Sequence, residues 1–117
     1  MLPAMFGWFK RTLQDFGRSS RWPSVRARHL ERFPTCAACG ASDRLEVHHV
    51  VPVGWAKRIG KPELELDPLN LITLCGPPRD CHWWLGHACD DRKWRPDVRR
   101  LAQVILTSNV KSQDDAV

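Results

Sequence analysis

Two pairs of cysteines carry the clearest chemistry in the sequence. Cys36 and Cys39 form a C-x-x-C motif followed by a glycine, and Cys75 and Cys81 form a second pair with five residues between them. Four thiolates that arrive as two pairs from separate segments are typical of a tetrahedral zinc site. The chain has five cysteines, an odd number, which argues against a complete disulfide framework. We therefore expect these four residues to bind a structural Zn²⁺, and Cys89 to be a small, semi-buried apolar residue.

An adjacent pair of histidines, His48 and His49, is the second chemical feature. The pair lies in the alternating, β-branched stretch 45–51, which predicts a strand that Pro52 ends. Successive side chains of a strand point to opposite faces, so both imidazoles serve one site only if the strand ends or bulges here. A metal beside the hairpin edge, with the second imidazole reaching over from the other side, would also satisfy this condition. A neutral imidazole can bind a metal ion or accept a proton near pH 7.

The stretch from Cys36 to Trp94 resembles the HNH endonuclease family. The resemblance covers about half of the chain and rests on four motifs: C-x-x-C-G at 36–40, L-E-V-H-H at 45–49, E-L-D-P-L-N-L-I-T-L-C at 65–75 and C-H at 81–82. The trailing Gly86, His87 and Trp94 are similar to a subgroup of phage and bacterial HNH proteins.

The resemblance implies an α+β fold: a small zinc-stapled ββα-metal (HNH, or His-Me finger) domain with flanking helices. In this fold a two-stranded hairpin packs on a helix, with one catalytic cation between them. By position, His49 would be the general base, and His48 and His82 would bind the cation. Asn70 would be the central asparagine, which either orients the hairpin loop or joins the metal ligands. The four cysteines would hold the separate structural zinc, and zinc binding would then be part of the folding energy.

The ligand set of the catalytic cation differs from the family pattern at one position. Many relatives have a further ligand four residues after the first helix histidine, and that position is Gly86 in this sequence. His87 follows His82 by five residues, about 140° around an α-helix. We therefore predict that His87 is not a ligand unless the helix breaks at Gly86. Because its ligands are imidazoles, the catalytic cation could be Mn²⁺, Ni²⁺, Co²⁺ or Zn²⁺ as well as Mg²⁺.

The activity that the resemblance implies is metal-dependent DNA endonuclease activity, cutting or nicking with low intrinsic sequence specificity. Hydrolysis of a phosphodiester needs a base for the attacking water and positive charge near the leaving oxygen, which a histidine and a divalent cation supply. The alternative is a non-catalytic, zinc-stabilised module that binds nucleic acid or protein, since one expected ligand is missing. A thiol redox role for the C-x-x-C motif is less consistent with the sequence, because no βαβ pattern surrounds it.

The elements that must position these residues can be read from periodicity. A helix is expected between Pro23 and Pro34, with the apolar stripe including His29 as a packed core residue. The apolar run 70–75 is expected to pair with the strand at 45–51, and 81–85 to open a helix that Gly86 weakens or stops. A last helix begins at Pro96. We divide the chain into an N-terminal arm or short helix (1–20), the nuclease domain (21–107) and a frayed tail (108–117).

Length and composition limit the class of protein. The chain has 117 residues, enough for one domain with short arms, and its 43% hydrophobic and 26% charged residues are typical of a soluble domain. No apolar run approaches the roughly 20 residues that a membrane span needs, and the N-terminal segment is a poor secretory signal. We expect an intracellular, cytoplasmic protein of phage or bacterial type.

Charge is concentrated at the two ends of the chain. Residues 1–33 hold seven Lys or Arg against two acids, residues 34–90 hold five against seven, and residues 91–117 hold six against four. Basic flanks around an acidic middle suit a protein that binds a polyanion with its ends and a cation at its centre. We expect DNA as the partner, together with a larger phage, repair or restriction protein. The expected phosphate contacts are Arg18, Arg21, Arg26, Lys57, Arg58 and Lys61.

The tryptophans are expected to have two kinds of role. Trp83, Trp84 and Trp94 are interpreted as core packing around the zinc and the helix. Trp55 is expected to be an exposed side chain of the loop near DNA.

Overall fold

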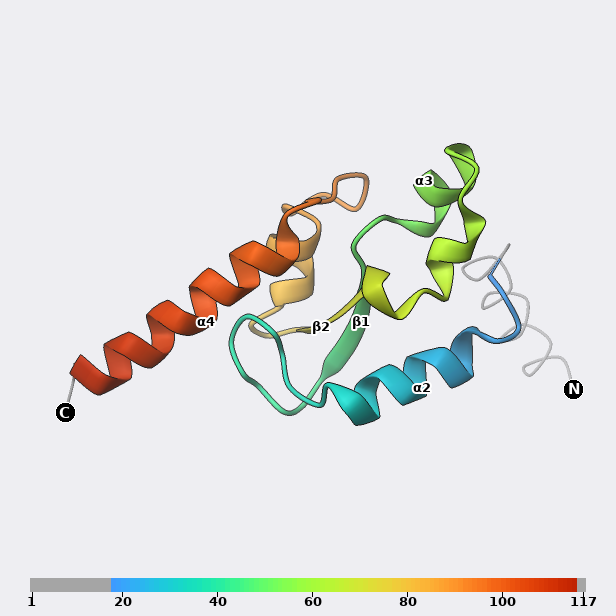
Figure 1. The fold of residues 1–117 in the computed structure, drawn as a ribbon. Helices are drawn as coiled ribbons and strands as arrows, with labels where there is room; N and C mark the ends of the chain where they lie inside the picture. Colours follow the sequence, from blue (N-terminus) through green and yellow to red (C-terminus); the bar gives the residue numbers. More distant parts are fainter. Residues whose placement is uncertain (1–17, 116–117) are drawn as a thin grey trace, which may run out of the picture.

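The centre of the fold is a two-stranded antiparallel sheet formed by β1 (Leu45–His49) and β2 (Leu71–Cys75). The computed structural model describes residues 18–115, so most of the expected arm 1–20 lies outside the described residues (Figure 1). Leu45 pairs with Cys75 and His49 with Leu71, so the strands are in register over their full lengths. Every residue of β2 is buried, as its apolar sequence predicts, whereas β1 is only partly buried.

The connection between the two strands is long and contains three short helical segments. These are α3 (Val53–Arg58) and the 3₁₀ turns η1 (Pro62–Glu65) and η2 (Pro68–Asn70). Pro62 and Pro68 stand in the first turns of the two 3₁₀ segments, where a missing backbone N–H costs nothing. The connection forms a separate lobe beyond the end of the hairpin (Figure 1).

Helix α2 (Trp22–Arg32) packs on the hairpin, and its boundaries agree with the prolines at 23 and 34. His29 is its buried residue, which confirms the prediction that this histidine packs in the core. After β2 the chain forms one π-helical turn, η3 (His82–Gly86), where a helix was expected to open. Helix α4 (Val98–Asp115) follows, so the predicted frayed tail is helical as far as Asp115.

The hydrophobic core joins these elements around the cysteines. Its buried members come from the C-x-x-C segment, β2, η3 and α4: Cys36, Ala38, Ile72, Leu74, Cys75, Cys81, Leu85, Val98 and Ala102. The expected α+β class is therefore confirmed as a small domain of helices and one antiparallel strand pair. Among the described residues, no helix is long and apolar enough to cross a membrane.

Candidate metal centres

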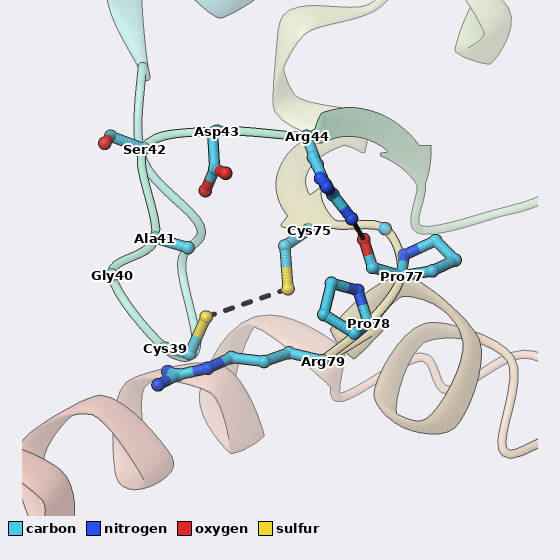
Figure 2. A pocket seen from close by; sticks show the side chains of 11 residues that line it. Cys39, Gly40, Ala41, Ser42, Asp43, Arg44, Cys75, Pro77, Pro78 and Arg79 are labelled. Atoms are coloured by element: carbon cyan, nitrogen blue, oxygen red, sulfur yellow. Dashed lines mark hydrogen bonds between the residues drawn. The ribbon is translucent and has the colours of Figure 1, made fainter.

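The four cysteines predicted to bind zinc lie together. The sulfur atoms of Cys36, Cys39, Cys75 and Cys81 are all within 4.8 Å of one another. Cys39 Sγ and Cys75 Sγ are 3.7 Å apart (Figure 2). Four sulfurs at the usual 2.3 Å from one zinc ion would be separated by about 3.8 Å, so the cluster has the size of a tetrahedral zinc site. It can hold a structural metal ion such as zinc.

Local backbone geometry forms this cluster. The C-x-x-C turn needs Gly40, whose φ of +78° is the left-handed region that glycine adopts without strain, and the Gly40 N–H donates to the Cys36 carbonyl at 2.9 Å. Between the second pair, the chain turns back on itself, and the Asp80 N–H donates to the Gly76 carbonyl at 3.0 Å. The five intervening residues therefore loop out and return Cys81 to Cys75.

The thiols of the cluster differ in acidity. Burial raises the pKa of Cys81 and of Cys75. Burial acts in the same direction on Cys39, but hydrogen bonds involving Ala41, its neighbouring thiols and Arg79 outweigh burial and lower its pKa to about 7. Figure 2 shows the Arg79 side chain extending alongside Cys39. Buried thiols of high pKa remain protonated without a cation, whereas a bound Zn²⁺ removes the proton from a coordinating thiol.

Three histidines form a second cluster, and His48 of this cluster lies near the end of the strand pair opposite to Cys75. Ligand nitrogens of His48, His82 and His87 lie within 4.8 Å of one another, and each pair of ring centroids is 4.9 Å apart. His48 comes from β1, His82 is the first residue of η3, and His87 directly follows its last residue. His48 Nε2 is buried and has no hydrogen-bond partner among the described residues. A buried ring nitrogen without a hydrogen-bond partner, inside a cluster of imidazoles, is suited to bind a metal ion.

The position of His87 matches the exception stated in the sequence-based prediction, because η3 ends at Gly86. In an α-helix His87 would lie about 140° away from His82. The turn is instead π-helical, and the His87 N–H donates to the His82 carbonyl at 3.1 Å. An i→i+5 turn brings residues five apart to the same side of the helix. Gly86 is buried, and it permits this close approach because a Cβ at this position would crowd the His48 ring.

Neighbouring acceptors orient the imidazoles of the cluster. Glu46 Oε2 lies 3.0 Å from His82 Nδ1, and the Lys93 carbonyl lies 3.0 Å from His87 Nδ1. Both acceptors require a proton on Nδ1, which leaves the Nε2 lone pair of each ring for a metal ion. Burial, followed by the charges of the other two rings, lowers the pKa of His48 to about 3. The His48 ring is therefore neutral at pH 7, with a lone pair available for a ligand bond.

His49 projects from the opposite face of β1, and no bulge interrupts the register at this pair. His49 Nε2 lies 2.9 Å from the Glu65 carbonyl oxygen, and the Trp22 ring packs on the imidazole with centroids 4.5 Å apart. Because a carbonyl only accepts, Nε2 carries the proton and Nδ1 carries the lone pair of the neutral ring. Burial lowers the pKa of His49, the Glu65 contacts raise it, and the charge of Arg18 lowers it further.

Asn70 ties the loop between the strands to the end of β1. Its Oδ1 accepts from the Val51 N–H at 2.8 Å, and its Nδ2 donates to the carbonyls of Val51 and Leu64, both at 3.0 Å. These bonds use both donors of the side-chain amide and engage its oxygen. Of the two roles left open for Asn70, the geometry supports the one that orients the loop.

The six basic residues expected to contact phosphate are all exposed: Arg18, Arg21, Arg26, Lys57, Arg58 and Lys61. Arg18 has the most direct relation to the histidines, because its guanidinium carbon lies 5.4 Å from the centroid of the Trp22 ring that packs on His49. Sequence reasoning missed the contacts of Glu46, Lys93 and Trp22 with the histidines. A signal existed only for Glu46, which lies two residues before His48 and therefore on the same strand face.

Comparisons of the chain with protein-family models, curated proteins and solved structures found no match.

Proposed function

We propose that this protein is a metal-dependent DNA endonuclease of the HNH type, built on a ββα-metal arrangement. The observation that carries the proposal is the convergence of His48, His82 and His87, next to a fourth histidine whose Nε2 is fixed by a backbone carbonyl. One cluster can hold a divalent cation, and His49 carries a basic Nδ1. Because His49 lies on the opposite face of β1, the proposal requires this nitrogen to reach the attacking water across the edge of the hairpin. Metal-assisted hydrolysis of a phosphodiester needs both groups.

Each histidine has a distinct role in this proposal. His48, His82 and His87 would hold the cation, which supplies positive charge to a phosphate oxygen and the leaving 3′-oxygen. His49 Nδ1 takes the proton of the attacking water. The Glu65 carbonyl keeps His49 in the tautomer that leaves Nδ1 unprotonated, and it stabilises the imidazolium after proton transfer. Glu65 is thus a positioning residue that acts through its backbone.

Substrate binding in this proposal depends on exposed cations of the N-terminal part of α2 and of the α3 lobe. Arg18 and Arg21 precede α2, and Lys57, Arg58 and Lys61 belong to α3 and the turn after it. Arginine and lysine contacts to phosphate fix the position of DNA but do not read its sequence. The proposed enzyme therefore cleaves with low sequence specificity unless a larger partner directs it.

A plasmid-nicking assay with Mg²⁺, Mn²⁺ or Ni²⁺ tests the proposal. The wild-type protein should convert supercoiled plasmid to the nicked form, and His49→Ala should reduce the rate by about 100-fold or more. His29→Gln is the matched control, because His29 is buried in α2 and belongs to neither cluster. Equal rates for the wild type and His49→Ala would refute the mechanism.

The non-catalytic binding module predicts a different result in the same experiment: gel-shift binding of DNA with no nicks in any of these metals. Its original motivation was an absent third histidine ligand. His87 supplies a third imidazole to the cluster, so this motivation no longer holds.

A further inference from the structure

Two tryptophans from distant segments of the chain form an aromatic pair. The ring centroids of Trp55 and Trp94 are 6.4 Å apart, and the ring planes are inclined by 49°. Trp55 is 45% exposed and Trp94 is half-buried. The expectation of core packing for three tryptophans is wrong for Trp83 and Trp84, which are 42% and 40% exposed. Figure 1 shows that α3 and the segment between η3 and α4 lie at the same end of the hairpin.

The backbone connects both tryptophans directly to the candidate site. The residue before Trp94 is Lys93, whose carbonyl accepts the hydrogen bond from His87 Nδ1. Trp55 stands in α3, which begins four residues after His49, at the end of β1. The two tryptophans therefore belong to segments that directly adjoin residues of the proposed catalytic centre.

The surroundings of the pair indicate the chemistry of its ligand. The segment 53–61 around Trp55 contains three basic residues and no acidic residue, whereas the segment 90–97 around Trp94 contains three basic and three acidic residues. The positive charge therefore lies on the Trp55 side of the pair, and an aromatic ring beside such charge complements a nucleobase with its phosphate. This combination is how proteins bind single-stranded nucleic acid, with bases on aromatic side chains and phosphates on cations.

A base held between the two rings needs them farther apart and more nearly parallel than the structure shows. Stacked bases in DNA rise by about 3.4 Å, so a base between two parallel rings needs about 6.8 Å between them. The observed 6.4 Å and the 49° inclination are those of an ordinary tilted aromatic pair, so the rings form a closed wedge without room for a base. Binding of a base therefore requires the exposed Trp55 side chain to rotate and open the wedge to this width. Bases of an intact duplex are stacked on each other and do not present a free face to such a wedge.

We propose that Trp55 and Trp94 bind an unpaired base of the substrate strand. The preferred substrate is then DNA with unpaired bases near the cleaved bond: a single strand, an overhang or a flap. The cleavage part of this inference rests on the proposed endonuclease function, whereas binding of the base requires no turnover.

Fluorescence anisotropy with labelled dT12 and a blunt 12-base-pair duplex tests the inference, using the full chain with zinc as the only metal. Wild-type protein should bind dT12 more tightly than the duplex. Trp55→Ala should weaken dT12 binding by about 10- to 100-fold and leave duplex binding within about twofold, whereas Trp55→Phe should lose less. Phe33→Ala is the matched control, since Phe33 is 50% exposed at the end of α2 and should be neutral.

A second measurement needs no variant and so does not depend on the folding of Trp55→Ala. A scan of single abasic sites through dT12 should weaken binding to the wild type at one or two positions. A flat scan, or equal dT12 affinity for the wild type and a folded Trp55→Ala, would overturn the inference and leave the pair as a contact for a protein surface. Cleavage that is independent of Trp55 also overturns it, whereas base binding without any cleavage overturns only the endonuclease proposal.

Discussion

Replacement of Gly86 by alanine tests whether the histidine cluster is a metal site. A Cβ at this position would lie 3.1 to 3.3 Å from three atoms of the His48 imidazole. Normal contacts begin at 3.4 Å, so the ring must move by a few tenths of an ångström. The φ of Gly86 is outside the left-handed region, so alanine introduces no backbone strain. The perturbation is therefore confined to the position of one proposed ligand.

The expected effect is large for metal binding and small for folding. Metal–ligand distances tolerate deviations of about 0.2 Å, and perturbing the groups that orient ligands typically costs 10- to 100-fold in affinity. We expect a loss of this size, about 1.4 to 2.8 kcal/mol, for the histidine site. Alanine is favoured over glycine within a helix by up to about 1 kcal/mol, which partly offsets the cost of moving the ring.

The assay is a calorimetric titration with Mn²⁺ or Ni²⁺ of protein that already carries one equivalent of Zn²⁺ at its four cysteines. Wild-type protein should bind a further equivalent, and Gly86→Ala should bind it 10- to 100-fold more weakly while retaining its zinc. Gly54→Ala is the matched control, because Gly54 lies in α3 and a Cβ there would contact nothing within 4 Å. Wild-type affinity in Gly86→Ala, with a normal fold, would refute the assignment of His48 as a ligand.

Three further predictions concern groups that support the two centres. Glu46→Ala removes the acceptor of His82 Nδ1 and should weaken binding of the second metal equivalent about 10-fold. Glu46→Gln keeps an acceptor oxygen, so its loss of affinity in the same titration should be smaller. Asn70→Asp places a carboxylate against the two carbonyls that accept from Nδ2 in the wild type. It should lower the free energy of unfolding by about 2–4 kcal/mol. An unchanged midpoint in urea titrations would contradict this role of Asn70. Burial and the charge of Arg99 lower the pKa of His29 in the folded protein below 6.5. As the pH drops below 6.5, His29 therefore takes up a proton in the unfolded chain before it does so in the folded protein, and the stability falls. His29→Gln should therefore flatten the dependence of unfolding free energy on pH between about 6.5 and 5, and identical slopes for both proteins would contradict it.

The sequence by itself determined the two strands, α2 and the four-cysteine cluster, but not the helical segments α3, η1 and η2 of the stretch that was expected to be a loop. Alternation at 45–49, the apolar run 71–75 and the prolines that bound α2 are local signals, and each predicted its element. The cysteines were predictable because ligand type and spacing within each pair are local properties, and the need for two pairs to meet follows from the tetrahedral preference of zinc.

The second centre depends on tertiary structure. His87 lies beside His82 because the turn between them is π-helical and so contains one residue more than an α-helical turn. In this turn Gly86 packs against His48, a strand residue that is distant in the chain. The same holds for Asn70, whose role became definite only when its three hydrogen bonds were located. Periodicity describes the direction of a side chain within one element, whereas a metal or base site requires the relative placement of several elements. That placement is decided by packing between them.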